Sequence, residues 1–288
     1  MEFEASLANA ITRAPAPLNN VEDIEVLRND RIFVTGARGS LGLDLVEILR
    51  SSQIQVLGTD IEECDVTNLE SVMENFESFV PTLIVHLAAD KHAPQGELDP
   101  LSTFMINTIG TRNIIEAKNR LTNKNECRIV LASTCKSCDP ETVYGASKLI
   151  SERLVLNDGG NVARFYNVIE TAGNVFEIWR NLPNDEPLEV TPCTRYFIHK
   201  DEAVSLLIRV MALGKAGVSE RGRFSFDPGP AIQMPNLARK LYPGRQIKEV
   251  HPRRGDRLKE PLHAQSEAIT SFDDRLWKVH SPHDSSQY

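Results

Sequence analysis

A glycine-rich turn between a short apolar run and an amphipathic segment constrains the fold of this chain more than any other feature. The run Arg31–Thr35 has the composition of a buried strand, and residues 43–49 repeat apolar side chains at helical spacing. Such a strand–turn–helix unit presents backbone amides and a helix N-terminus to the phosphates of a dinucleotide. We therefore predict an α/β fold, a Rossmann-type doubly wound parallel sheet with a small C-terminal substrate-binding lobe. The predicted cofactor-binding residues of the turn are Gly36, Arg38, Gly39, Ser40, Leu41 and Gly42.

A second predicted strand, residues 55–60, ends in a carboxylate that bears on the choice of cofactor. Asp60 lies about twenty residues past the glycines, where an acid accepts the ribose hydroxyls of NAD and repels the 2′-phosphate of NADP. Arg38 argues the other way, because a guanidinium there could bind that phosphate. We predict NAD, with NADP as the alternative.

The edge of the predicted sheet beyond this strand is short. Residues 63–67 follow almost at once, which leaves no room for a crossover helix of usual length. Asp65 and Val66 are expected near the adenine. The next buried strand, 82–89, should face the cofactor with its carboxyl end, as strands of open α/β sheets do. Further predicted cofactor contacts are Leu87, Ala88, Ala89 and, from the apolar helix 102–117, Asn107. Tyr144 and Lys148 complete the predicted cofactor-binding set.

The stretch 131–148 carries the candidate reactive side chains. It leaves a buried strand, 128–132, and leads into a predicted amphipathic helix. Tyr144 and Lys148 are one helical turn apart and project to the same side. An adjacent ammonium favours the phenolate, which makes Tyr144 a usable base, and Lys148 could also bind a ribose. By itself this spacing is common on helix surfaces, so its weight comes from the dinucleotide turn upstream.

Length and charge limit the class of protein. A chain of 288 residues suits one α/β domain and a smaller lobe, and its net charge of −8 argues against nucleic acid as the main partner. We predict an N-terminal arm (1–30), a dinucleotide-binding domain (31–168), a partly interleaved substrate-binding lobe (169–279) and a disordered tail (280–288).

Cysteine usage and hydropathy indicate the cellular environment. The five cysteines are scattered and odd in number, which is typical of reduced thiols in the cytoplasm. Cys135 and Cys138 form a lone C-x-x-C without a second ligand pair, so we expect no metal. No run approaches membrane-spanning length and the N-terminus lacks a signal-peptide pattern. We expect a cytoplasmic protein that forms a homo-oligomer.

Basic side chains recur in the later part of this acidic protein. They are Arg195, Arg253, Arg254 and Arg257. On a solvated surface they would need no further explanation, but guanidinium groups also bind diphosphates through paired hydrogen bonds. Lys91 and His92, in the predicted loop 90–94, leave surface and site interpretations equally open.

The order of these segments is more specific than any one of them. The informative stretches are Ile11–Leu18, Thr35–Gly42, His86–Pro94, Asn107–Asn113, Thr134–Ser137, Tyr144–Lys148, Arg164–Val168, Thr194–Phe197 and Arg253–Glu260. Together they resemble the extended short-chain dehydrogenase/reductase superfamily and, within it, the CapD-type UDP-N-acetylglucosamine dehydratases of polysaccharide biosynthesis. The resemblance extends from about residue 11 to about residue 262.

The resemblance implies a dehydratase that acts on UDP-GlcNAc or a close relative. Tyr144 would take the O4 proton while NAD takes hydride from C4, and Lys136 would then remove H5 before water is lost across C5 and C6. The implied catalytic set is Thr134, Cys135, Lys136, Tyr144 and Lys148. The implied substrate-binding set is Lys91, His92, Asn167, Arg195, Arg253 and Arg257.

Cys135 departs from the family pattern, which has an Asp at this position as the acid for the leaving hydroxyl. A thiol is a weaker acid, although the adjacent Lys136 could lower its pKa. The triplet Ser133–Cys135 also resembles the tunicamycin-pathway dehydratase, which forms a 5,6-alkene and returns hydride to C4 instead of C6. Both positions of hydride return therefore remain open.

Two other classes of function fit part of the pattern. A nucleotide-sugar 4-epimerase needs Tyr144, Lys148 and NAD but has no use for a base at H5, so Lys136 argues against it. A non-catalytic NAD(H)-binding sensor or scaffold would need none of the side chains of Tyr144, Lys148 and Lys136, and their presence argues against that class.

Overall fold

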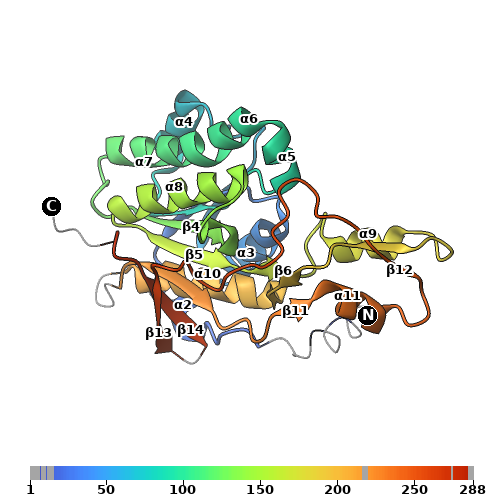
Figure 1. Cartoon of the computed structure of the whole chain (residues 1–288). Helices are drawn as coiled ribbons and strands as arrows, with labels where there is room; N and C mark the ends of the chain where they lie inside the picture. Colours follow the sequence, from blue (N-terminus) through green and yellow to red (C-terminus); the bar gives the residue numbers. More distant parts are fainter. Residues whose placement is uncertain (1–6, 8–10, 12–15, 216–219, 274, 285–288) are drawn as a thin grey trace.

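A mixed eight-stranded sheet organises the molecule (Figure 1). The computed structural model describes residues 7, 11, 16–215, 220–273 and 275–284. From one edge to the other, the strands are β2 (Gln55–Thr59), β1 (Arg31–Thr35), β3 (Leu83–His86), β4 (Arg128–Thr134), β5 (Asn161–Phe165), β10 (Arg223–Phe226), β14 (Leu276–His280) and β13 (Ala268–Asp273). The first six strands are parallel to one another. Strand β14 pairs antiparallel with β10, and β13 pairs antiparallel with β14. This is the predicted Rossmann-type sheet, and it is confirmed.

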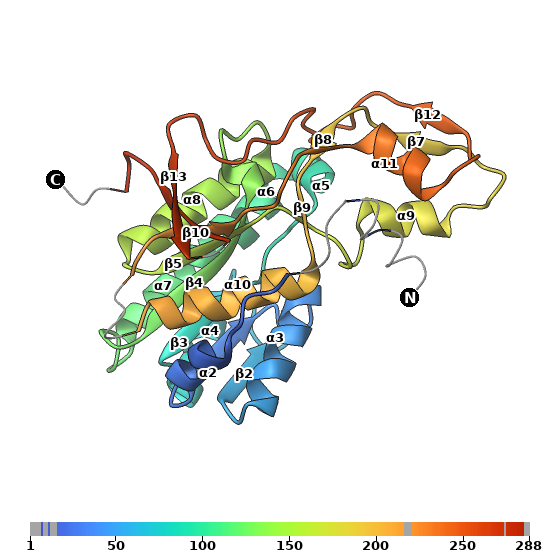
Figure 2. The ribbon, with the colours of Figure 1, turned by 90° about the horizontal axis from the view of Figure 1, so that it is seen from below.

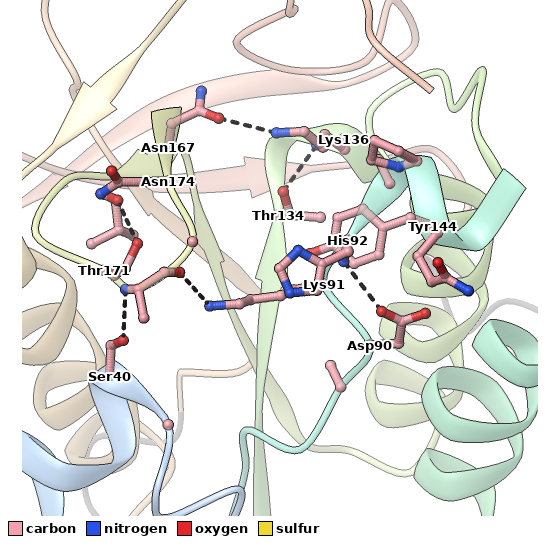
Figure 3. Close-up of a pocket in the computed structure, with 18 of the residues that line it drawn as sticks. Ser40, Asp90, Lys91, His92, Thr134, Lys136, Tyr144, Asn167, Thr171 and Asn174 are labelled. Carbon is pink, nitrogen blue, oxygen red and sulfur yellow. Dashed lines mark hydrogen bonds between the residues drawn. The ribbon is translucent and has the colours of Figure 1, made fainter. Parts of the chain in front are cut away.

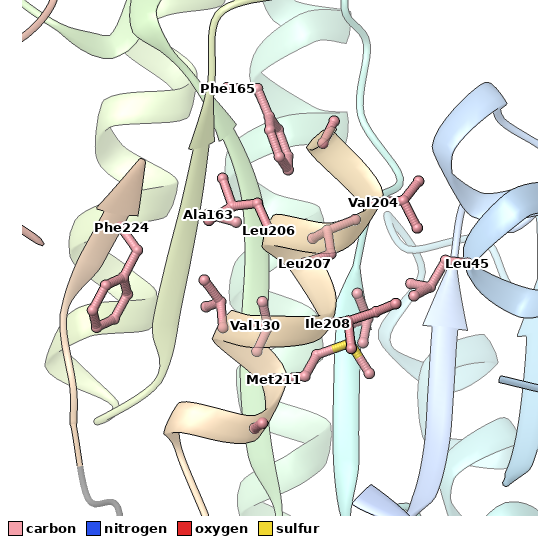
Figure 4. Close-up of a cluster of buried hydrophobic side chains, with 14 of the residues drawn as sticks. Leu45, Val130, Ala163, Phe165, Val204, Leu206, Leu207, Ile208, Met211 and Phe224 are labelled. Carbon is pink, nitrogen blue, oxygen red and sulfur yellow. The ribbon is translucent and has the colours of Figure 1, made fainter. Parts of the chain in front are cut away.

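Helices cover both faces of the sheet, as expected when parallel strands are buried on both sides. One layer contains α4 (Leu69–Phe79), α7 (Gly110–Arg120) and α8 (Val143–Asn157), and the other contains α2 (Val21–Leu27), α3 (Ser40–Ser51) and α10 (Lys200–Leu213) (Figures 1 and 2). In the second layer, Leu206, Leu207 and Met211 of α10 pack against Val130 and Ala163 of the central strands (Figure 4). The carboxyl ends of the strands are left uncovered by these helices.

The short edge of the sheet consists of turns. Residues 61–67 form no strand, and β2 is the outermost strand on this side. The chain passes from these turns into α4, whose N-terminus is capped by the Asn68 side chain. The edge is therefore trimmed as expected, and the segment around Asp65 lies directly beside the strand ends.

The region predicted as a substrate lobe, residues 169–279, is divided between two places. A projecting part contains α9 (Val175–Asn181), α11 (Met234–Leu241), β7 (Leu188–Val190) and β12 (Ile247–Glu249) around its own apolar cluster (Figure 1). The remainder returns to the sheet as α10, β10, β13 and β14. Three short strands, β6 (Asn167–Val168), β8 (Thr194–Arg195) and β9 (Phe197–Ile198), join the two parts, and β11 (Ile232–Gln233) pairs with β8.

Both ends of the described chain pack on the body. The backbone N–H groups of Ala16 and Leu18 donate to the side chains of Glu202 and Ser205 on α10, so this part of the arm lies across the main domain. At the other end, the expected disorder of residues 280–288 is wrong for the described part, since Asp284 pairs with the buried Arg223 at 3.0 Å. Residues 285–288, like 1–6, 8–10 and 12–15 of the arm, lie outside the described residues. Within the described ranges, no helix is long and apolar enough to cross a membrane.

A buried network of charges fixes α8 on the sheet. The Glu152 carboxylate accepts hydrogen bonds from Arg164 of β5 at 2.6 Å and from Arg223 of β10 at 2.7 Å, and also from the hydroxyls of Ser133 and Ser137. Burial tends to raise the pKa of Glu152, but the guanidinium groups outweigh it and lower the pKa to about 2. Glu152 therefore contributes to stability above its unfolded pKa of about 4.3, and this contribution is lost as the pH falls toward 2.

We expect Glu152→Gln to lower the free energy of unfolding by about 3–5 kcal/mol, because it removes the carboxylate that two buried guanidinium groups share. Urea denaturation at neutral pH measures the loss. Glu249→Gln, which removes a carboxylate from the exposed pair with Arg239, is the matched control with an expected change below about 1 kcal/mol. Similar losses in the two variants would contradict the role given to Glu152.

Candidate active site

A cavity of about 1570 Å³ lies at the carboxyl ends of the parallel strands, between the sheet and the projecting part of the chain. Side chains from both regions enter it, with Ser40 and Lys91 from the sheet side and Asn167 and Asn174 from the other (Figure 3). A loop closes part of the opening: the Ala172 N–H donates to Ser40 Oγ at 3.2 Å, and Lys91 Nζ donates to the Ala172 carbonyl at 3.1 Å. Ligands of open α/β sheets bind at this place.

The glycine turn forms one end of the cavity and fits a dinucleotide. Gly36 has φ of 66°, and a Cβ atom there would lie 2.7 Å from the Ala88 backbone nitrogen. A Cβ atom on Gly42 would lie 2.5 Å from the Gly36 carbonyl oxygen, so neither position accepts a side chain. Helix α3 begins at Ser40, and its N-terminus points at the space that the turn leaves open. The backbone cradle for a pyrophosphate is therefore built into the fold.

The far end of the cofactor region is acidic. Asp60, Asp65 and Val66 line the cavity, as do Leu41, Leu87, Ala88 and Ala89. Asp60 accepts a hydrogen bond from the Arg38 backbone N–H at 3.1 Å. The Arg38 side chain, predicted as a cofactor contact, is not among the lining residues and instead pairs with Glu62 and Glu63. Its guanidinium is thus neutralised by its neighbours and turned from the site.

Asn107 lies behind the cavity wall and not in it. It is buried in a π-helical turn (Met105–Ile109), where its side chain accepts from the Asp90 N–H at 2.8 Å and donates to the Asp90 carbonyl at 3.0 Å and to Ser147 Oγ at 2.9 Å. Asn107 does not line the cavity, and its predicted contact with the cofactor stays a prediction. The polar side chain in the apolar helix instead anchors the loop that carries Lys91 and His92 to α8.

Tyr144 and Lys148 lie side by side on α8 and line the cavity with Thr134. Thr142 caps the helix by accepting the Gly145 N–H at 3.0 Å, which places Tyr144 in the first turn. Burial lowers the pKa of Lys148 to about 8. Burial also raises the pKa of Tyr144, and the positive charge of Lys136 is the largest effect in the opposite direction. In the ligand-free protein the expected preference for the phenolate is therefore outweighed by desolvation.

Lys136 enters the cavity from the short helical turn that follows β4 (Figure 3). Its ammonium donates to Asn167 Oδ1 at 3.1 Å and lies 2.9 Å from Glu260 Oε1. Burial by itself would lower the pKa of Lys136, but the attraction to Glu260 outweighs it and raises the pKa above the usual lysine value. The residue predicted as the H5 base is thus held as an ammonium in the ligand-free protein.

Cys135 does not line the cavity. Its side chain is fully buried in the core on the α10 side of the sheet, and its thiol contacts Glu260 Oε2 at 3.7 Å. Burial and the Glu260 charge raise its pKa to about 12, and the opposing effect of Lys136 is smaller. Lys136 thus does not make this thiol acidic, and the thiol does not line the cavity.

Of the predicted substrate-binding residues, all but one line the cavity. Lys91, His92, Asn167, Arg195 and Arg253 line the cavity. Arg257 does not, because its guanidinium is buried against the 135–141 segment and donates to the Cys138 carbonyl at 2.7 Å. Its role in the structure is to hold the loop after β4 to the later basic segment.

Glu260 is the site residue that our sequence reasoning missed. It ends the basic segment 253–260 and reaches Lys136, Asn167 and Arg195 from behind the cavity wall. No local spacing connects residues 136 and 260, so only the tertiary fold brings them together. An acid at the end of a basic loop was the available signal.

We expect Cys135→Asp to lower the free energy of unfolding by about 2 kcal/mol or more at pH 8, because it places a second carboxylate beside Glu260 in a fully buried position. The pKa of the new carboxyl would be raised by this environment, so the loss should shrink as the pH falls toward 5. Thermal unfolding at both pH values measures it, with Cys135→Ser as the uncharged control. Equal stability of the two variants at pH 8 would contradict the buried position of residue 135.

Comparison with known proteins agrees with this geometry. The family model described as "Polysaccharide biosynthesis protein" matches residues 52–277. The chain is 27% identical over 273 residues to the capsular polysaccharide biosynthesis protein CapD of Staphylococcus aureus, covering 83% of this chain and 44% of that protein. It is 26% identical over 212 residues to the UDP-N-acetylglucosamine 4,6-dehydratase (inverting) of Campylobacter jejuni, covering 69% and 61%.

A solved structure shares the fold over most of the chain. The structure of Pen from Bacillus thuringiensis superposes with a TM-score of 0.74 at 20% identity and covers 90% of this chain and 91% of that one. By contrast, the chain spans less than half the length of CapD. The match over most of the sequence, together with the Rossmann-type sheet and the dinucleotide turn, shows that the chain belongs to the polysaccharide biosynthesis protein family of the extended short-chain dehydrogenases/reductases.

Proposed function

We propose that this protein is an NAD-dependent dehydratase that acts on a nucleotide sugar, UDP-GlcNAc or a close relative. One observation carries the proposal: Tyr144, Lys148 and Lys136 enter the same cavity as the dinucleotide turn. Similarity to the Campylobacter jejuni dehydratase supports the class of reaction.

Tyr144 and Lys148 would carry out the first step. Tyr144 accepts the proton of the sugar O4 hydroxyl, and the ammonium of Lys148 on the next helical turn stabilises the phenolate. Bound NAD, held by the turn at Gly36 and Gly39 with its ribose at Asp60, would supply the hydride acceptor and later the hydride donor. Burial raises the pKa of the Tyr144 phenol, and the positive charge of Lys136 in the same cavity and the hydrogen bond with Thr134 lower it, so both favour loss of the proton.

Lys136 would carry out the elimination. Once C4 is a ketone, H5 becomes acidic, and the neutral amine of Lys136 takes that proton as the C5–H electron pair moves to form the C5–C6 double bond. Hydroxide leaves C6 and receives a proton from the ammonium that Lys136 has become, so the residue acts first as a base and then as an acid. Cys135 takes no part in this sequence, since its thiol lies outside the cavity.

The dehydratase class includes two positions of hydride return. Return to C6 gives a 4-keto-6-deoxy sugar, and return to C4 gives a 5,6-alkene. Substrate deuterated at C4 distinguishes them by NMR of the product, since the label appears at C6 in the first case and at C4 in the second.

A 4-epimerase is the second candidate, favoured by the absence of Cys135 from the cavity. Without an acid at this position, Tyr144 and Lys148 make up the pair that oxidation and reduction at C4 require. Incubation with UDP-GlcNAc and mass spectrometry decides between the candidates. Loss of one water supports the dehydratase, an unchanged mass with a new epimer supports the epimerase, and unaltered substrate supports a non-catalytic NAD(H)-binding protein.

We expect Lys136→Ala to abolish water loss while leaving oxidation at C4, because Tyr144 and Lys148 remain in place. Mass spectrometry reports the elimination, and a transient rise in NADH absorbance reports the oxidation. Tyr144→Phe is the matched control and should abolish both signals. Water loss at the normal rate in Lys136→Ala would remove this residue from the mechanism.

We also expect tighter binding of NAD than of NADP, by tenfold or more, because Asp60, Glu62 and Glu63 would repel a 2′-phosphate while Arg38 is already paired. Calorimetric titration with both cofactors measures the ratio. The double variant Glu62→Gln/Glu63→Gln, which frees the Arg38 guanidinium, should reduce it. Tighter binding of NADP to the unaltered protein would show that Arg38 governs the choice.

A further inference from the structure

Glu260 is a buried carboxylate that contacts the candidate base from outside the cavity. Only 4% of the residue is exposed, and its carboxylate oxygens lie 2.9 Å from Lys136 Nζ, 3.4 Å from Arg195 Nε and 3.7 Å from Cys135 Sγ. The Asn167 side chain donates to Glu260 at 2.6 Å and accepts from Lys136 at 3.1 Å, so one amide orders both partners. Neither the proposed steps nor the implied family residues use this acid.

The charges around this pair come from several elements. Lys136 is faced by Glu260, by the thiol of Cys135 and by the phenol of Tyr144 on α8. Glu260 is faced by Lys136 and by Arg195 of β8. Since a buried thiol and a buried phenol stay neutral near pH 7, Glu260 is the negative charge next to Lys136 in this set. Cys135 is important here because an ionised Asp in its place would add a second negative charge.

We propose that Glu260 controls the protonation state of Lys136 and, through it, the pH range in which proton abstraction from the sugar proceeds. The second part rests on the function proposed above. An ammonium has no lone pair, so Lys136 can take H5 only after it has lost its own proton. A carboxylate at 2.9 Å stabilises the ammonium and delays that loss to higher pH. Glu260 is thus a positioning residue that acts through Lys136.

The structure also explains why this control is local. Glu260 is shielded from solvent and from the cavity by Lys136, Asn167 and Arg195, so counterions screen the pair little. Replacing the carboxylate by a neutral amide leaves the partly buried Lys136 with Asn167 as its hydrogen-bond partner but without the adjacent negative charge. Burial, which disfavours the ammonium, is then no longer outweighed by Glu260.

Lysine side-chain NMR on the full chain with 13C/15N-labelled lysine tests the first part without any substrate, with Lys136→Arg assigning the signal. We expect no titration of Lys136 below pH 10.4 in the unaltered protein and a pKa at least about one unit lower in Glu260→Gln. Glu260→Asp keeps the charge at a greater distance and should shift the pKa less. Glu141→Gln, which removes an exposed carboxylate paired with Arg257 of the same segment, should shift nothing.

The pH dependence of water loss from UDP-GlcNAc tests the second part. In Glu260→Gln, the rise of kcat with pH should move to lower pH by the same amount as the NMR pKa, with KM little changed. Glu260→Asp should restore most of the original profile, which a general loss of folding would not do.

Each outcome bears on a different claim. An unchanged Lys136 pKa in Glu260→Gln would overturn the inference, as would titration of Lys136 below about pH 10.4 in the unaltered protein, a measurement that needs no variant to fold. A shifted pKa with an unmoved pH profile would overturn its catalytic part. A shifted pKa in a protein that dehydrates no nucleotide sugar would contradict the proposed function while supporting the electrostatic role of Glu260.

Discussion

A fully buried carboxylate, Glu152, holds the helix that carries the candidate reactive side chains. Arg164 and Arg223 approach it from two neighbouring parallel strands, so α8 cannot rotate or slide without separating buried charges. Lys148 and Tyr144 lie one and two helical turns before Glu152 and therefore share its side of the helix. The same interaction that anchors the helix inside the protein directs its first turns toward the cavity at the strand ends.

A second buried carboxylate, Glu260, has a different position and a different consequence. Glu152 is surrounded by guanidinium and hydroxyl groups that belong to the scaffold, whereas Glu260 contacts a lysine that enters the cavity. Burial raises the energetic cost of separating either pair. In the first case that cost stabilises an arrangement of helix and strands, and in the second it opposes the loss of a proton by Lys136. Arg257 completes the second arrangement by tying the basic segment to the loop after β4.

Cys135, at the position where the family that the sequence resembles has an Asp, suits its environment in this fold. The residue points into the core beside Glu260 and away from the cavity, and a neutral side chain suits that environment. Two carboxyl groups in these positions could not both be ionised, so one of them would stay protonated. In this chain the negative charge near Lys136 comes from Glu260 in a distant segment, and the residue at position 135 stays neutral.

The sequence by itself determined the fold class and the two ends of the site. Periodicity and spacing predicted the central strands, the glycine turn, Asp60 at the end of the second strand, and Tyr144 and Lys148 on one side of a helix, since these depend on residues close together in the chain. Tertiary structure alone decided which polar side chains reach the cavity. Asn107, Cys135 and Arg257 fit the motif pattern but point elsewhere, and Glu260 was brought to Lys136 across more than a hundred residues. The physical reason is that local periodicity fixes the face of a helix or strand, while the orientation of a loop side chain depends on the buried partner that satisfies its charge or hydrogen bonds.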